Sequence, residues 1–409
     1  MADSTQHAPA AIAPAGVAGA HLQFLLRLNN LLQFLTNCAW YIGTPFIPLY
    51  LVAHGASVGA VGAVAGLSGV APLAVALHVG GLVDERGPTV VLVGSVGLFG
   101  LGAAMLAAFS GILEVAIAFT LLTAANIGLA VASQAVVAGA STPVTRIRNY
   151  GYYAVSYSAG AVVGPVIGGF LAARLGYTTA FAAMALLMVP SFAVASMVRA
   201  ARIADGRRVA AGAVHTVIGT IVRERGVGAV LFVSAMMNCA QALQSTFYPL
   251  YLSHVGLSVT LIGIAIAAIS VASMAVRMLL ARAVAQLGQT GALVGAIALS
   301  AVALAATPFA RQFWPLLGVS ALMGASLGFT QPLSMSLLAE LVAQQFWGAA
   351  FGIRQSVQRV ASVVSPFVFG AASAARGLES AFYLGALVLF GAAGVTARMA
   401  KSFGHRPDS

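Results

Sequence analysis

The sequence predicts an all-α polytopic membrane protein whose twelve transmembrane helices form two pseudo-symmetric halves of six. Composition is the first reason, because 60% of the 409 residues are hydrophobic and only 7% are charged, whereas roughly a quarter are charged in soluble domains. The second is that apolar runs of about 20 residues, enough to cross the hydrocarbon core as a helix, recur along the whole chain. These runs do not alternate polar and apolar residues, which excludes barrel strands.

An internal repeat is the third reason. A constant shift of 201 residues superimposes short segments and single glycines and prolines: 37–39 (Asn-Cys-Ala) on 238–240, 48–51 (Pro-Leu-Tyr-Leu) on 249–252, Gly55 on Gly256, Gly87 on Gly288, Gly151 on Gly352 and Pro165 on Pro366. A duplicated chain of this kind predicts two parallel six-helix units with a substrate site near mid-membrane between them.

The apolar runs and the polar breaks between them give the elements in order. We expect helices over residues 22–52, 58–82, 88–110, 112–140, 148–173, 178–199, 227–253, 258–285, 290–309, 313–341, 349–373 and 380–399. The domains are then a disordered tail (1–20), an N-terminal half (21–199), a linker (200–226), a C-terminal half (227–399) and a second tail (400–409). Most arginines fall on the side of the linker, so positive-inside bias makes that side, with both termini, cytoplasmic. We expect a multi-pass protein of the plasma membrane, such as a bacterial inner membrane.

The fifth expected helix carries a glycine-rich pattern: Gly151, Gly160, Gly164, Pro165, Gly168 and Gly169. Glycines at every fourth residue share one helix face and let another helix approach closely, while Pro165 should bend the helix. The spacing resembles motif C, the antiporter signature in drug and metabolite exporters of the major facilitator superfamily. That resemblance implies the twelve-helix fold of the family and the export of a small organic molecule.

Residues 80–87 resemble motif A of the same superfamily, which lies between helices 2 and 3. Gly80, Asp84 and Gly87 match the motif, Arg86 adds one basic residue, and Glu85 stands where the family has arginine. The resemblance implies that Asp84 latches against the N-terminal end of helix 11, where a carboxylate is favoured by the helix dipole. The arginine of motif B is absent from helix 4, which leaves proton coupling open.

Polar stripes at helical spacing supply candidate substrate contacts on the helices that line the cavity in this family. Under the 201 shift the stripes of helices 1 and 7 coincide, so both point at one pseudo-symmetric place. The candidates are Asn30, Gln33, Asn37, Trp40 and Tyr41 on helix 1, Asn126 and Gln134 on helix 4, Asn238, Gln241 and Ser245 on helix 7, and Gln331 on helix 10. The alternative for each residue is an interhelical hydrogen bond, which stabilises a membrane bundle by about 0.6 kcal/mol.

Charges expected inside helices are the remaining candidates. Arg277 and Arg359 lie deep enough to need a partner and would attract an anionic substrate. Arg354 is expected to snorkel from a helix end, or to form a structural pair with Glu340, as Arg277 also would. Glu340 and His78 are the candidates for proton coupling, since helices 1, 4 and 7 contain no carboxylate.

We therefore expect a secondary active transporter that moves a small organic molecule by alternating access, in the export direction. The alternatives are an organic-anion transporter, by symport or exchange, and, from another class, a channel or a non-transporting sensor. The sequence has no GxxxxGK[ST], HExxH or CxxC motif, so we expect no enzyme, cofactor or metal site. The expected partners are the substrate, protons as candidate coupling ion and the lipid bilayer, with no nucleic acid and a monomeric state.

Overall fold

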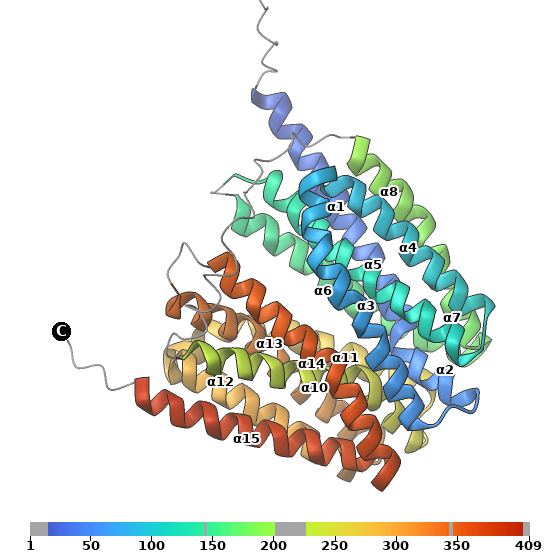
Figure 1. The fold of residues 1–409 in the computed structure, drawn as a ribbon, viewed down its shortest axis with the longest axis vertical. Helices are drawn as coiled ribbons and strands as arrows, with labels where there is room; N and C mark the ends of the chain where they lie inside the picture. Colours follow the sequence, from blue (N-terminus) through green and yellow to red (C-terminus); the bar gives the residue numbers. More distant parts are fainter. Residues whose placement is uncertain (1–14, 143–144, 201–225, 343–346, 404–409) are drawn as a thin grey trace, which may run out of the picture.

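A computed structural model describes residues 15–142, 145–200, 226–342 and 347–403, and nearly all of them are helical (Figure 1). The N-terminal half consists of α1 (Ala15–Gly43), η1 (Thr44–Phe46), α2 (Ile47–Ala53), α3 (Val58–Arg86), α4 (Pro88–Ala108), α5 (Ile112–Gly139), α6 (Arg146–Leu175), α7 (Tyr177–Leu186) and α8 (Met188–Ala200). The C-terminal half consists of α10 (Val227–His254), α11 (Val259–Arg277), α12 (Leu280–Ala306), η2 (Thr307–Phe309), α13 (Phe313–Leu341), α14 (Trp347–Arg376) and α15 (Glu379–Phe403).

Twelve crossings result, because α1, η1 and α2 follow one another as a single crossing, and so do α7 and α8. Within the described residues, nine helices are long and apolar enough by themselves to span a membrane. The prediction of an all-α polytopic protein is confirmed. Expected helices 3 to 5 end within a few residues of α4, α5 and α6.

The eighth expected helix is where the boundaries were wrong. A helix over 258–285 was expected, but α11 ends at Arg277 and the chain turns at Met278 and Leu279 before α12. The expected helix was too long because the residues after the turn are mostly apolar. The same stretch contains Arg277 and Arg282, whose charges are costly inside lipid. Both side chains are exposed.

The repeat seen in the sequence recurs in the backbone. Three glycine pairs, each 201 residues apart, have left-handed φ angles: Gly55 and Gly256 (87° and 86°), Gly87 and Gly288 (83° and 69°), and Gly176 and Gly377 (89° and 87°). Five of these glycines follow the ends of helices, and Gly288 breaks α12 at a kink. Glycine adopts this conformation without steric cost. The same glycine therefore interrupts the helical chain at the corresponding place in each half.

Side-chain contacts repeat at the same offset. The hydroxyl of Tyr50 donates to the carbonyl of Phe109 at 3.3 Å, and that of Tyr251 to the carbonyl of Ala310 at 3.1 Å. The same two tyrosines pack edge-on against phenylalanines, Tyr50 on Phe181 and Tyr251 on Phe382, with ring centroids 5.1 and 5.3 Å apart. The two halves are therefore alike in packing as well as in sequence.

Equivalent serines cap α3 and α11, and their removal provides a stability test. Ser57 accepts from the amide of Ala60 at 3.2 Å, and Ser258 from that of Leu261 at 3.4 Å. We expect Ser57→Ala and Ser258→Ala each to lower the free energy of unfolding by about 1 kcal/mol, the usual value of an N-cap. Thermal unfolding in detergent measures this, with Ser253→Ala, an exposed serine near the end of α10, as control. A loss no larger than that of the control would contradict the prediction.

The two halves meet mainly through two pairs of helices, α3 with α14 and α6 with α11, and α10 also contacts η1, α2 and α3. A Cβ placed on Gly62 would lie 2.6 Å from the carbonyl oxygen of Pro366, and one on Gly169 would lie 2.8 Å from that of Val259. Glycine is needed at both positions because backbone meets backbone there. Gly263 of α11 lies against the Pro165 carbonyl in the same way.

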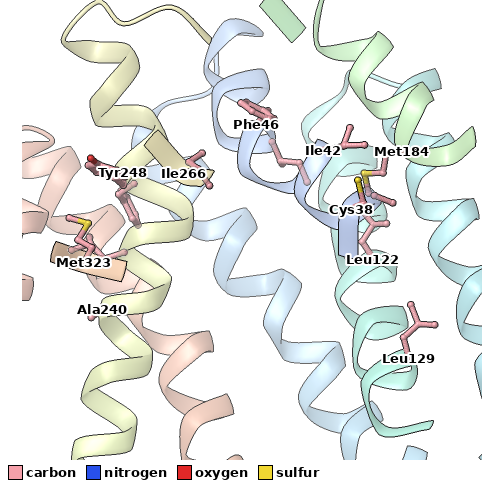
Figure 2. Close-up of a cluster of buried hydrophobic side chains, with 14 of the residues drawn as sticks. Cys38, Ile42, Phe46, Leu122, Leu129, Met184, Ala240, Tyr248, Ile266 and Met323 are labelled. Carbon is pink, nitrogen blue, oxygen red and sulfur yellow. The ribbon is translucent and has the colours of Figure 1, made fainter. Parts of the chain in front are cut away.

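These contacts lie near one end of the bundle, which we call the far end; it carries Gly55 and Gly256. The opposite end, where α8 ends and α10 begins, is called the linker end. Figure 1 shows the helices of the two halves converging at the far end, beside α2, and diverging toward the linker end. Buried apolar side chains run through both halves: Figure 2 shows Cys38, Met184 and Leu122 in the N-terminal half and Tyr248 and Met323 in the C-terminal half.

Candidate functional site

A polar pocket lies in the C-terminal half between α10, α13 and α14. Its lining residues are Ser234, Met237, Asn238, Gln241, Leu327, Thr330, Gln331, Ser334, Arg354 and Gln358. The polar members of α10 and α14 are three or four residues apart, and on α13 Thr330 and Gln331 lie four and three residues before Ser334. Each helix therefore presents one polar face. Three such faces converge, as expected of polar groups that must avoid lipid.

Arg354 is the charged residue of this pocket, and only 4% of its surface is exposed. Its Nε donates to the Ser234 hydroxyl at 3.2 Å and its Nη2 donates to the Ser334 hydroxyl at 3.0 Å. Ser234 belongs to α10 and Ser334 to α13, so the guanidinium links all three helices. Its recorded partners within the described residues are thus neutral hydroxyls.

The structure corrects three expectations about charge. Arg354 does not snorkel, because it is buried in the pocket. Glu340 pairs with neither Arg354 nor Arg277; it accepts a hydrogen bond from the side-chain amide of Gln289 instead. Arg277 is the last residue of α11 and is exposed, because the helix ends before the expected boundary. Its predicted depth in the membrane was therefore wrong.

Three of the polar candidates come together in the pocket, namely Asn238, Gln241 and Gln331. Ser245 lies farther along α10, where it is exposed and its hydroxyl donates to the carbonyl of Ala242 at 3.2 Å. It is not among the lining residues. The polar stripe of helix 7 is thus divided between the pocket and the region toward the far end.

The stripe of helix 1 has a different surrounding. Gln33 and Asn37 are only 5% and 3% exposed, and Asn37 donates to the Gln33 carbonyl at 3.2 Å. Asn37 also lies against α6, because a Cβ on Gly160 would approach its Cβ to 2.8 Å. Trp40 packs toward Phe99 of α4, with ring centroids 6.2 Å apart. Most of this stripe therefore serves packing within the N-terminal half in the present conformation.

Two members of the helix 1 stripe, Asn30 and Tyr41, differ from these packed residues. Asn30 is half-buried, and its Oδ1 has no hydrogen-bond partner. The Tyr41 hydroxyl lies within hydrogen-bonding reach of that of Tyr157 on α6. Arg359, from α14 of the other half, lies close enough to Tyr157 for their charges to interact. Tyr41 and Tyr157 are thus paired within the N-terminal half, and Arg359 approaches Tyr157 from the other half, about two turns from the contacts at the far end.

The fourth expected helix is α5 (Ile112–Gly139), which carries the candidates Asn126 and Gln134. The Tyr150 hydroxyl donates to the backbone carbonyl of Gln134 at 3.1 Å, and the hydroxyl of Tyr153 lies within hydrogen-bonding reach of the Gln134 side chain. Gln134 is exposed, whereas Asn126 is half-buried farther along α5. Tyr150, Tyr153 and Tyr157 follow one face of α6, so they line the N-terminal half opposite the pocket.

The glycines of motif C divide between two partners. Gly160, Gly164 and Gly168 lie against α1, whereas Pro165 and Gly169 lie against α11 of the other half. A Cβ on Gly164 would lie 2.6 Å from the Cβ of Tyr41. Gly151 has no neighbour within 4 Å of an added Cβ.

Of motif A, Gly87 ends α3 at a φ of 83° and Arg86 is exposed. Gly80 and Asp84 lie in α3, but their surroundings fall outside the description, as do residues 343–346 before α14. The expected latch of Asp84 against helix 11 is therefore outside the described part of the chain. Of the coupling candidates, His78 and Glu340 both have exposed side chains.

Sequence reasoning missed Arg354, Gln358, Tyr153 and Tyr157 as members of the site. The 201 shift was the available signal, since it places Tyr153 on Arg354 and Tyr157 on Gln358. Equivalent positions on α6 and α14 thus supply tyrosines from one half and an arginine and a glutamine from the other. The repeat was applied to helices 1 and 7 but not to this pair.

Known proteins match both the sequence and the fold. The chain is 25% identical over 375 residues to the multidrug resistance protein MdtG of Citrobacter koseri, covering 88% of this chain and 91% of that protein. Among solved structures, the nucleoside transporter NupG has a TM-score of 0.76 at 12% identity over 92% of this chain and 99% of its own. The peptide transporter POT, in complex with sulfate, has a TM-score of 0.73 at 14% identity over 92% and 95%.

The two structural likenesses establish the fold alone, because their sequence identity is low. The sequence itself decides the family. The profile of the Major Facilitator Superfamily matches residues 30–310 and 230–407, and the motifs, the twelve crossings and the repeat agree with that match. The protein belongs to the Major Facilitator Superfamily and is a multi-pass membrane transporter.

Proposed function

We propose that this transporter exports a small organic molecule from the cytoplasm by alternating access. The observation that supports this proposal is where the two halves touch. Their glycine-lined contacts, α3 with α14 and α6 with α11, lie near the far end, and the halves diverge toward the linker end (Figure 1). Positive-inside bias assigns the linker end to the cytoplasm. A carrier in this conformation would load its substrate from that side.

The relatives support export in a limited way. MdtG is named a multidrug resistance protein, and motif C belongs to exporters in the family. NupG and POT are named as nucleoside and peptide transporters, and they share only the fold with this chain. The substrate contacts proposed here are Asn238, Gln241 and Gln331 of the pocket, with Tyr41 and Arg359 on the far-end side.

The same geometry supports a mechanism in which the halves rock about the bound molecule. Glycine faces form both seams: backbone meets backbone at Gly62 and Gly169. Elsewhere in the α3–α14 seam, Phe367 and Val363 lie against Gly66 and Gly69. Smooth faces of this kind can separate and meet again at low steric cost. Substrate bound between Tyr41 on one half and the pocket on the other would be exposed first at one end and then at the other. Protons are the proposed coupling ion, with His78 and Glu340 as candidate carriers.

Drug sensitivity and accumulation test the proposal. The chain would be expressed in a host that lacks its own exporters, and a panel of neutral, cationic and anionic compounds compared with and without a proton-gradient uncoupler. We expect lower accumulation of at least one class, with saturation at high concentration and loss on uncoupling. Flux that never saturates would favour the channel alternative, and unchanged accumulation of every compound would refute export.

A further inference from the structure

The buried Arg354 of the pocket has no acidic partner among the described side chains. The acidic side chains described in the C-terminal half are Glu340 and Glu379. Glu340 is held by Gln289, and Glu379 starts α15 at the far end. A cation at depth in a membrane protein is expensive unless something compensates it. Its serine partners supply oxygen atoms but no charge.

The guanidinium also has donor capacity left over. Arginine has five N–H groups on three nitrogens, and the recorded bonds use one N–H of Nε and one of Nη2. Nη1 has no recorded partner in the described structure, and Arg354 is itself one of the residues that line the pocket. A planar fork of free N–H groups matches a carboxylate, which accepts two parallel hydrogen bonds.

The rest of the pocket suits the charged end of such a ligand, since its free volume of about 10 Å³ has room for one small group. Asn238, Gln241, Gln331 and Gln358 offer neutral amides, which can donate to an anion without competing for Arg354. Met237 and Leu327 add apolar surface at the same site. The lining has no acidic residue, so nothing in it repels a negative charge.

We propose that the Arg354 pocket binds the anionic group of the cargo, a small organic carboxylate with an apolar portion. The assignment rests on the proposed transport function and names the chemical class of what is carried. Arg354, between Ser234 and Ser334, is the anchor for the carboxylate, and the amides of α10, α13 and α14 orient it.

Binding to the purified full-length protein in detergent tests the proposal. Hexanoate and benzoate are the probes, and hexanamide and benzamide are neutral analogues of nearly the same shape. The readout is the shift of the unfolding temperature as a function of probe concentration. We expect at least one carboxylate to raise this temperature with saturation, and its amide to bind at least tenfold more weakly. Equal shifts from acid and amide, or none from either acid, would overturn the proposal.

Three variants locate the effect. Arg354→Gln should weaken carboxylate binding at least tenfold, and Arg354→Lys should weaken it less, because it keeps the charge but loses the fork. Arg277→Gln removes one charge from the exposed end of α11 and should bind as the wild type does. Loss in Arg277→Gln equal to that in Arg354→Gln, or wild-type binding by Arg354→Gln, would contradict the assignment.

The unfolding temperature of the protein without ligand distinguishes an anchoring role of Arg354 from a structural role. An uncompensated buried charge does not stabilise the fold, so Arg354→Met should unfold at the wild-type temperature or above it. Ser334 already donates to the carbonyl of Gln331 at 3.0 Å, so the substitution does not leave its hydroxyl proton unsatisfied. A clear fall in the unfolding temperature would show that Arg354 holds the bundle together, and would refute its role as an anchor.

The export panel separates this inference from the proposed function. If neutral or cationic compounds are exported and carboxylates are not, the protein is an exporter and the anion site is refuted. If no compound of any charge is exported, the proposed export function and the assignment of a carboxylate cargo are both refuted. Export of carboxylates that is lost in Arg354→Gln and kept in Arg277→Gln supports both.

Discussion

Oxidising the double variant Gly59→Cys/Ala374→Cys should stop transport, and reduction should restore it. The two residues belong to α3 and α14, in different halves, at the far end. A Cβ built on Gly59 lies 3.5 Å from the Cβ of Ala374, within the range of about 3.5–4.5 Å found in disulfides. A bond at this place would hold the far end closed, and alternating access requires that end to open.

The chain offers clean controls for this lock. Nothing lies closer than 3.5 Å to the added Cβ of Gly59, so the single variants should fold and transport normally under oxidation. The native Cys38 and Cys239 are free and lie in the middle of their helices. Mass spectrometry would measure the cross-linked fraction. Full cross-linking with undiminished transport would show that α3 and α14 do not separate during the cycle.

The sequence predicted the repeat and the helix face that carries motif C because both depend on local rules. A glycine at a positive φ and a glycine every fourth residue have the same consequence in any helical bundle. The 201 shift paired Gly55 with Gly256 and Gly87 with Gly288 in advance, whereas the pair Gly176 and Gly377 was recognised only in the structure. Helix ends were less certain where arginines interrupted an apolar run, as at Arg277.

The site was harder to predict, because a polar stripe shows which residues share a face but not which neighbour covers it. In the N-terminal half, α6 meets the stripe of α1 with Gly160, Gly164 and Gly168, and Asn37 is buried. Under the 201 shift, α14 has the larger Ala361, Ser365 and Phe369 at these positions. Side chains in place of a bare glycine face keep α14 from approaching α10 as closely, and the pocket lies between these helices and α13. Polar stripes at equivalent positions thus gave a packed seam in one half and a pocket in the other.

Gly164→Leu should abolish transport by forcing α1 and α6 apart. Even the first carbon of a side chain would lie 2.6 Å from the Tyr41 Cβ and 2.7 Å from the Cys38 carbonyl oxygen, and a backbone atom cannot rotate away. Overfilling a packed interior typically costs about 1–3 kcal/mol, and here it would also displace Tyr41 from Tyr157. We expect transport to fall at least tenfold and the unfolding temperature to drop, measured on protein purified from the membrane.

Two further leucines show whether the effect belongs to this seam. Gly97→Leu introduces the same side chain on α4, where nothing lies within 4 Å of an added Cβ, and should change neither property. Gly263→Leu, whose Cβ would meet the Pro165 carbonyl, acts between the halves and leaves the core of each half intact. It should therefore abolish transport without lowering the unfolding temperature, because it opposes closure of the far end and leaves α1 packed on α6. Equal losses of stability in Gly263→Leu and Gly164→Leu would contradict this division. The α6–α11 contact would then contribute to the packing of the fold as the α1–α6 contact does, and not to closure between the halves alone.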